Sequence, residues 1–180
     1  MAGLFSRKDK LVDLFSAQVP PHILQQLAHP PATGERLSQG PVEFIFVMAQ
    51  GHGDQDTAEL IGAITADAHG AGWMVQALVC NLVVLVRGTV PLRDPPVLER
   101  AALVDQLMDT CACRIKAVHG AEQASFGTMG SSARKAHGVL LPSFPQATGQ
   151  LLALPLGQSL ALGMAEVAAH EPAPRAGRLG

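Results

Sequence analysis

The chain has 180 residues and a mass of 18.8 kDa, with 48% hydrophobic and 16% charged residues and a mean hydropathy of +0.22. This composition excludes a disordered protein, and a net charge of −2 excludes a surface that holds nucleic acid by positive charge. The three cysteines are Cys80, Cys111 and Cys113. Because their number is odd and their spacing does not suit a disulfide scaffold, they indicate a reducing compartment. We therefore expect a soluble, globular, cytoplasmic protein.

Neither a targeting signal nor a membrane anchor is predicted. The charged N-terminus is not followed by the apolar run of a signal peptide. The longest apolar stretch, Met74 to Val86, is interrupted by Gln76 and Asn81. It is also shorter than the roughly 20 residues that span a bilayer. We expect no membrane partner and no nucleic-acid partner.

The first forty residues are predicted to form a helical extension and a linker, residues 1–40. Two short segments have apolar residues at helical spacing: the first contains Leu11, Leu14 and Phe15, and the second contains Ile23, Leu24 and Leu27. Each segment ends at a pair of prolines, which stop a helix. Residues 30–41 are rich in proline, glycine and polar side chains, which is typical of a connector. The extension is therefore expected to lie outside the core.

The domain itself is predicted over residues 41–165 and begins with a strand and a helix. Val42 to Ala49 is a nearly continuous run of β-forming residues, as in a strand covered on both faces. After Gly51-His52-Gly53, either Asp54 or Asp56 is expected to cap a helix. That helix has an apolar stripe formed by Leu60, Ile61, Ile64 and Ala68. It is expected to end near Gly70 and Gly72.

The next elements complete a recognisable order. Residues 73–79 and 82–86 are strand-like runs separated only by Cys80-Asn81, which predicts a β-hairpin. A second amphipathic helix is indicated by the spacing of Val97, Ala101, Val104 and Met108, and residues 114–118 predict a fourth strand. The order βαββαβ is typical of an α+β, ferredoxin-like fold.

The remaining segments have weaker patterns. Residues 120–138 are dominated by small residues and are predicted to form a flexible hairpin arm, with a short strand at 139–141. A helix is possible within 146–164, although Gly149, Pro155 and Gly157 disfavour it. Residues 166–180 are predicted to be a disordered tail.

Four local stretches in this order resemble the class III adenylate/guanylate cyclase catalytic domain. They are Phe15 to Leu27, which is similar to the segment leading into many bacterial cyclase domains; Pro41 to Gly51, similar to the first strand; Gly72 to Gly88, similar to the strand hairpin; and His119 to Arg134, similar to H-T-G-E followed by G-N-x-G-S-x-x-R. The resemblance implies a nucleotidyl cyclase-like fold and pairing of two chains.

The same resemblance assigns the family's functional positions to residues that do not carry its chemistry. The two metal-binding aspartates fall on Met48 and Asn81, the base-recognising lysine on Ala77, and the transition-state asparagine and arginine near Pro145 and Gly149. Residues 135–174 contain no arginine. Cyclisation needs two hard cations held by carboxylates and a positioned cation on the phosphate. The resemblance thus implies a pseudo-cyclase without a cofactor.

Other candidate sites have ordinary structural interpretations. His52 with Asp54 and Asp56 could hold a metal, but a polar turn with a helix-capping aspartate is favoured. Cys111-Ala-Cys113 lacks a partner pair, so buried packing is favoured over metal binding. His119 with Glu122 is interpreted as structural. Gly127 to Ser132 lacks the lysine of a phosphate-binding loop and is interpreted as part of the arm.

Three functions stay open from the sequence. The first is a non-catalytic regulatory domain of bacterial signalling that acts as a homodimer, or as a heterodimer with another cyclase-like protein. The second is a module that binds a nucleotide or another small ligand in the vestigial cleft. The third is an active cyclase with unorthodox residues, in which Asp54 or Asp56 binds metal.

Overall fold

The computed structural model describes residues 37–88, 99–111, 113–130 and 135–163. The predicted N-terminal helices, the tail and the end of the glycine-rich segment lie outside these residues. The described strands and helices follow one another along the chain in this order: β1 (Leu37–Ala49), α3 (Asp54–Gly70), β2 (Met74–Val79), β3 (Leu82–Gly88), α4 (Arg100–Thr110), β4 (Ile115–Gly130), β5 (Lys135–Leu140), α5 (Phe144–Ala153) and β6 (Ser159–Ala161).

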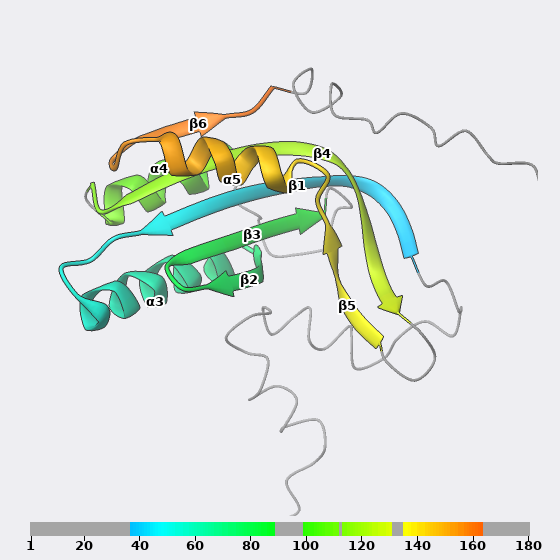
Figure 1. Cartoon of the computed structure of the whole chain (residues 1–180), viewed down its shortest axis with the longest axis horizontal. Coiled ribbons are helices and arrows are strands. Elements are labelled where there is room, and N and C mark those ends of the chain that lie inside the picture. The colour runs from blue at the N-terminus through cyan, green and yellow to red at the C-terminus, as the bar shows by residue number, and fades with distance from the viewer. Residues whose placement is uncertain (1–36, 89–98, 112, 131–134, 164–180) are drawn as a thin grey trace, which may run out of the picture.

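One mixed sheet organises the domain, with strand order β2-β3-β1-β4-β5 and β6 added alongside β4 (Figure 1). The pairs β1–β3, β1–β4, β2–β3 and β4–β5 are antiparallel, whereas β4–β6 is parallel. The first four strands and the two helices between them have the βαββαβ order of a ferredoxin-like fold. The predicted α+β class and the core topology are therefore confirmed.

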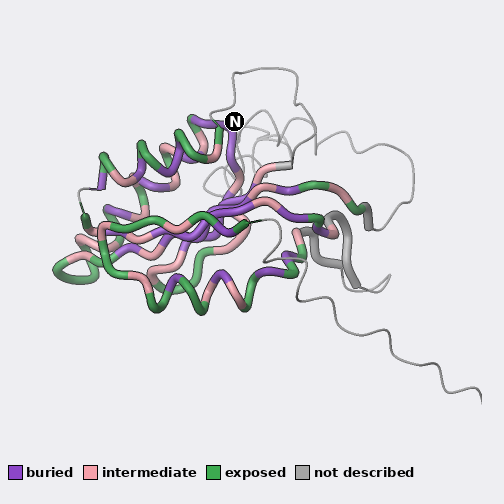
Figure 2. Tube along the Cα trace, turned by 90° about the horizontal axis from the view of Figure 1, so that it is seen from above, coloured by how far each residue is buried: buried purple, intermediate pink, exposed green. Residues whose placement is uncertain are grey.

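Helices cover both faces of the sheet (Figure 2). On one face α3 and α4 bury a cluster that includes Ile45, Ile64, Trp73 and Leu107. On the other face α5 packs on β1 and β4 over a second cluster that includes Phe44 and Phe46. Alternate residues of β1 enter the two clusters because side chains of a strand point to opposite faces in turn. The predicted double-sided burial of this strand is confirmed.

Several boundaries differ from those predicted. The connector assigned to residues 30–41 was wrong from Leu37 onward, because residues 37–41 pair with β4 as the start of β1. The fourth strand is much longer than residues 114–118, since glycine and alanine through Gly130 still pair with β1 and β5. The second helix begins at Arg100, and Val97, which was expected to belong to it, lies outside the described residues.

The last elements were only partly predicted. A hairpin does form between β4 and β5, and it bends away from the body of the sheet in Figure 1. The helix considered within residues 146–164 is α5, which starts earlier and ends at Ala153 before Pro155. Strand β6 was not predicted, because three residues give no periodic pattern.

Candidate functional site

The carboxyl end of β1 and the tip of the β2–β3 hairpin lie next to each other. Met48 of β1 is paired with Leu82, the first residue of β3. The backbone N–H of Ala49 donates to the carbonyl oxygen of Asn81 at 2.9 Å, and Asn81 Nδ2 donates to the Ala49 carbonyl oxygen at 2.7 Å. The structure thus brings Met48 and Asn81 together at one end of the sheet.

The donor atoms at this end do not suit a pair of divalent cations. Met48 offers a thioether, which is a soft ligand, whereas Mg²⁺ and Mn²⁺ prefer carboxylate oxygens. Asn81 is neutral, and its amide nitrogen is already engaged with β1. Among residues 37–88, 99–111, 113–130 and 135–163, no group of three His, Cys, Asp or Glu side chains is arranged to hold a metal. The side chains of Met48 and Asn81 therefore do not fit the metal ions of a two-metal reaction.

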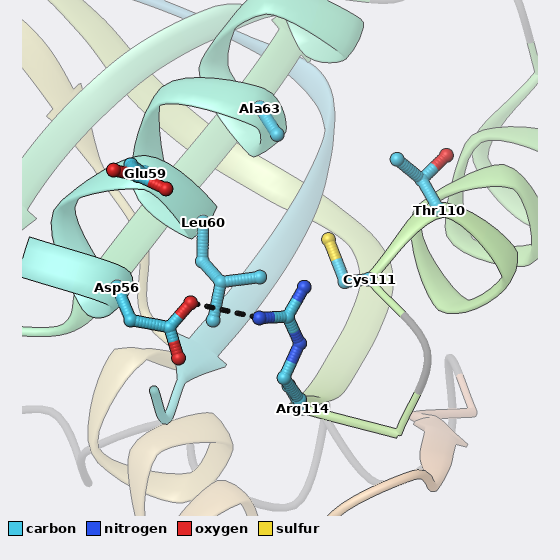
Figure 3. A pocket seen from close by; sticks show the side chains of 7 residues that line it. All are labelled: Asp56, Glu59, Leu60, Ala63, Thr110, Cys111 and Arg114. Carbon is cyan, nitrogen blue, oxygen red and sulfur yellow. Dashed lines mark hydrogen bonds and ion pairs between the residues drawn. The ribbon is translucent and has the colours of Figure 1, made fainter. Parts of the chain in front are cut away.

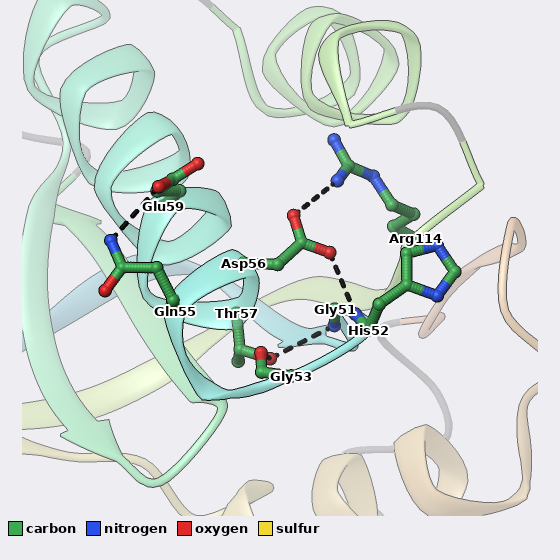
Figure 4. Close-up of polar contacts among 8 residues, drawn as sticks. All are labelled: Gly51, His52, Gly53, Gln55, Asp56, Thr57, Glu59 and Arg114. Carbon is green, nitrogen blue, oxygen red and sulfur yellow. Dashed lines mark hydrogen bonds and ion pairs between the residues drawn. The ribbon is translucent and has the colours of Figure 1, made fainter.

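The loop between β1 and α3 directs its backbone amides to acceptors within the protein (Figure 4). The N–H of Gln50 donates to the Arg114 carbonyl oxygen at 2.8 Å, and the N–H of Gly51 donates to Thr57 Oγ1 at 3.1 Å. The N–H of His52 donates to Asp56 Oδ2 at 2.8 Å. Three successive amides ahead of a helix could bind an anion, but here each has an internal acceptor.

Asp56 is the anion of this loop. The hydrogen bond from the His52 amide lowers the pKa of the Asp56 carboxyl most, and the positive charge of the Arg114 guanidinium lowers it further. Desolvation by burial opposes these two effects. Arg114, the residue just before β4, donates from its Nη1 to Asp56 Oδ1 at a distance of 2.8 Å. Both side chains are partly exposed, so this ion pair is a positioning contact rather than a buried charge.

The predicted aspartate cap of α3 was wrong. Gly53 is the N-cap residue and makes no side-chain cap bond, while Asp56 reaches back to His52, one residue before the cap. Gly51 is required by space, because a Cβ there would lie 2.5 Å from the Thr57 nitrogen. His52 and Asp54 are exposed and do not join Asp56 in a metal-binding group within the described residues.

A small pocket opens between α3 and the end of α4 (Figure 3). Its volume is about 150 Å³, and its wall includes Leu60, Cys111 and Arg114. This is below the range of about 300–1,000 Å³ that is usual for ligand pockets. Burial raises the pKa of the Cys111 thiol and so favours its protonated form over the thiolate that binds metals or attacks substrates.

The two cysteines at this end differ in environment. Cys111 is buried as predicted, but the same prediction was wrong for Cys113, which is exposed. Cys113 has a positive φ of 62°, so the chain turns there between α4 and β4 and directs the second side chain outward.

The remaining positions assigned by the resemblance are spread over β2 and α5. Ala77 follows an irregularity in the β2–β3 register and packs against the α5-side cluster. Pro145 lies in the first turn of α5 and Gly149 in its middle, and both are exposed. None of the three provides a hydrogen-bonding side chain, so none can take the role of lysine, asparagine or arginine.

His119 and Glu122 lie on opposite faces of β4 and do not form an acid–base pair. His119 packs on the α4 side of the sheet, where burial lowers its pKa most and the positive charge of Arg100 lowers it further. It lies within β4, whereas the resemblance implied the end of the strand. Glu122 Oε2 accepts the Ser143 N–H and Glu122 Oε1 accepts the Ser143 hydroxyl, each at 2.9 Å. These two hydrogen bonds support the structural interpretation of Glu122.

Two charged contacts were not predicted from the sequence. Arg114 was treated only as a strand residue, although it supports the Asp56 loop. Glu43 forms an ion pair with Arg87, and Arg100 Nη1 lies 3.6 Å from Glu43 Oε1. One signal for the second contact was present: a single glutamate inside an apolar strand requires a cationic partner when it is buried.

No family model matches the sequence, and no curated protein matches it. Solved structures do match, and they define the fold as that of adenylyl and guanylyl cyclase catalytic domains. No helix in the described part of the chain is long and apolar enough to cross a bilayer.

Three of these structures illustrate the similarity. A bacterial light-regulated adenylyl cyclase aligns with a TM-score of 0.60 and 11% identity over 89% of this chain, which spans 54% of that protein. The adenylyl cyclase CyaB from P. aeruginosa aligns with a TM-score of 0.51 and 13% identity over 75% of this chain and 82% of its own. The guanylyl cyclase Cya2 aligns with a TM-score of 0.50 and 9% identity, covering 76% and 80% respectively.

Proposed function

We propose that this protein is a non-catalytic cyclase-homology domain that acts as a regulatory interaction module in the bacterial cytoplasm. One observation carries the proposal: the neighbouring side chains at the end of β1 and the hairpin tip, Met48 and Asn81, are a thioether and an amide, and that amide is hydrogen-bonded to Ala49. Two-metal cyclisation needs carboxylates where Met48 and Asn81 lie.

The loop after β1 supports the same proposal. A nucleoside triphosphate is an anion, and backbone amides at a helix start are the groups that bind such anions. In this chain the Asp56 carboxylate occupies the His52 amide and carries negative charge at the same place. This arrangement disfavours both turnover and the alternative of a nucleotide-binding module.

Self-association into a homodimer is the interaction we propose first. Large apolar side chains that remain exposed include Val79 at the hairpin tip and Leu152 in α5. Exposed apolar side chains of this kind are typical of contact surfaces when they cluster. Closed two-fold pairing is the commonest geometry of soluble oligomers. Light scattering after size exclusion should give a dimer mass at tens of micromolar protein; a monomer mass contradicts this part of the proposal.

Restoring the missing ligands tests the metal argument. The double variant Met48→Asp/Asn81→Asp should gain a thermal stabilisation that depends on Mn²⁺, while the wild-type chain should gain none. The control is Met48→Asn, which places two amides side by side without charge. In metal-free buffer the double variant should be less stable than this control because two carboxylates repel each other. A wild-type shift equal to that of the double variant contradicts the proposal.

Calorimetry separates the interaction module from the ligand-binding alternative. ATP, GTP and their cyclic products, titrated with and without Mn²⁺, should release no saturable heat with the wild-type chain. Saturable binding at micromolar concentration would instead support the module that binds a nucleotide without converting it.

A further inference from the structure

An apolar groove lies where the β4–β5 hairpin meets the start of α5. Its volume is about 310 Å³, and it is lined by Ser125, Val139, Leu140, Leu141, Pro142 and Phe144. Five of these residues are apolar and none is charged. The groove is therefore suited to an uncharged, apolar occupant and not to a nucleotide.

Two side chains of this groove are exposed to an extent unusual for their size. Leu140 is 52% exposed and Phe144 is 42% exposed, even though the Phe144 ring packs edge-on against Phe46 at 5.2 Å between centroids. Each square ångström of apolar surface removed from water stabilises a protein by about 25 cal/mol. Covering these two side chains would thus favour docking of an apolar segment.

One segment of the same chain has matching chemistry. Ile23, Leu24 and Leu27 have the spacing of one side of a helical turn, and no Asp, Glu, Lys or Arg occurs from Leu14 to Gly34. The other apolar segment, around Leu11, is flanked by Lys10 and Asp13. The uncharged lining of the groove therefore favours the segment at 23–27.

The entry point of this segment into the fold lies near the groove. In the sheet Gln39 is paired with Ser125, and Ser125 is paired with Leu140. Two strand spacings separate β1 from β5, which is about 10 Å. Ten residues from Leu27 to Leu37 can span up to about 35 Å. The segment can therefore reach the groove of its own chain.

We infer that the apolar segment Ile23–Leu27 docks into the groove between the β4–β5 hairpin and α5 of the same chain. The anchors are the three apolar side chains of one helical turn, in the manner of an amphipathic helix in a groove. This intramolecular contact is independent of whether the domain is catalytic. It covers part of the apolar surface that would otherwise be open to a partner.

Hydrogen exchange on the chain of 180 residues tests the contact. Amides of residues 23–28 should exchange at least ten times more slowly in the wild-type chain than in Leu140→Glu. The matched control Leu152→Glu places the same charge at a more exposed leucine outside the groove, and it should leave this protection unchanged. Equal exchange of residues 23–28 in the wild-type chain and Leu140→Glu overturns the inference. Protection that falls on hundredfold dilution also overturns it, because the occupant is then a second copy.

A reciprocal measurement keeps the inference testable if Leu140→Glu fails to fold. In a Leu140→Cys variant, alkylation of the new thiol should be slow, and replacing Ile23, Leu24 and Leu27 by Glu should accelerate it at least tenfold. The exposed Cys80 is the internal reference and should react at the same rate in both proteins. Unchanged alkylation at position 140 contradicts docking in the groove.

Discussion

The two faces of the sheet are closed to different degrees. On the first face α3 and α4 together cover the strands, and Ile64, Trp73 and Leu107 are fully buried. On the second face α5 is the described helix that packs on the sheet, chiefly over β1 and β4, and its own Phe144 and Leu152 remain exposed. The first face forms the stable core, whereas the second retains apolar surface that is available for contacts.

The comparison also separates stability from function in this fold. The groove, the α5 positions assigned by the cyclase resemblance and Met48 all belong to the second face or its edge. Changes on the first face should alter folding, and changes at exposed positions of the second face should alter contacts with little effect on folding. The following predictions test that division, beginning with the largest expected effect.

The same substitution on the two faces should have very different costs. Leu107→Ala removes a fully buried side chain between α4 and the sheet. It should lower the free energy of unfolding by about 2–5 kcal/mol. Leu152→Ala removes a side chain that is 63% exposed and should change it by less than about 0.5 kcal/mol. Urea denaturation measures both, and equal losses would show that the second face is as closed as the first.

The loop after β1 should be sensitive at one glycine and tolerant at the next. Gly51→Ala places a Cβ 2.5 Å from the Thr57 nitrogen and 2.8 Å from the Asp56 carbonyl carbon, both backbone atoms. We expect a loss of about 1–3 kcal/mol.

The matched control is Gly53→Ala, where no atom lies within 4 Å of the added Cβ and φ is −174°. Its stability should stay within about 0.5 kcal/mol of wild type, since the weaker cap and the stiffer unfolded chain offset each other. If the two variants lose equal stability, the close approach of the loop to α3 is not what constrains it.

The two titratable groups on opposite faces of β4 should respond to pH with opposite signs. Burial lowers the pKa of His119 below its usual value of 6.5. The contribution of His119 to stability is therefore complete above pH 6.5 and is lost as the pH falls below that value. Burial raises the pKa of Glu122, so its contribution is complete below 4.5 and is lost as pH rises through its folded pKa.

Urea denaturation across pH 4 to 8 measures these two slopes. His119→Asn should remove the fall in stability at acid pH, where burial and Arg100 both disfavour the imidazolium and Asp105 favours it. Glu122→Gln should remove the fall that accompanies rising pH while still accepting the Ser143 amide. Unchanged slopes in both variants would assign the pH dependence to other groups.

The smallest effect is expected at the C-terminus of α5. Lys116 Nζ donates to the carbonyl oxygens of Leu152 and Leu154 at 3.1 and 3.0 Å, which places a cation at the negative end of the helix. Lys116→Met retains the apolar stem and should cost about 0.3–1 kcal/mol. Faster amide exchange should be confined to α5, and exchange that is faster throughout the sheet contradicts a local role.

How much could be predicted from the sequence differed between local and long-range features. Helix α3 and the β2–β3 hairpin have strong periodic or turn patterns, and their bounds were predicted to within about two residues. The start of β1 and the end of β4 were missed because Gly40, Pro41 and Gly127 disfavour strands locally, and only pairing between the two strands places them there.

The candidate site shows the same limit. The cyclase resemblance assigned the two metal positions to Met48 and Asn81, and the structure places these residues next to each other. The Asp56–Arg114 pair joins residues 58 positions apart, so no local pattern could indicate it. The uncharged groove beside Phe144 depends on how the arm meets α5, which sequence spacing does not determine.

The most direct test of the non-catalytic assignment is a sensitive cyclase assay on the purified chain of 180 residues. ATP and GTP are supplied in turn with Mg²⁺ or Mn²⁺, and formation of the cyclic nucleotide is compared with a protein-free blank and with the variant Asp54→Asn/Asp56→Asn. We predict that the wild-type chain forms no product above the blank at any metal concentration. Product above the blank that disappears in the double variant would contradict the account and identify an active cyclase with unorthodox metal ligands.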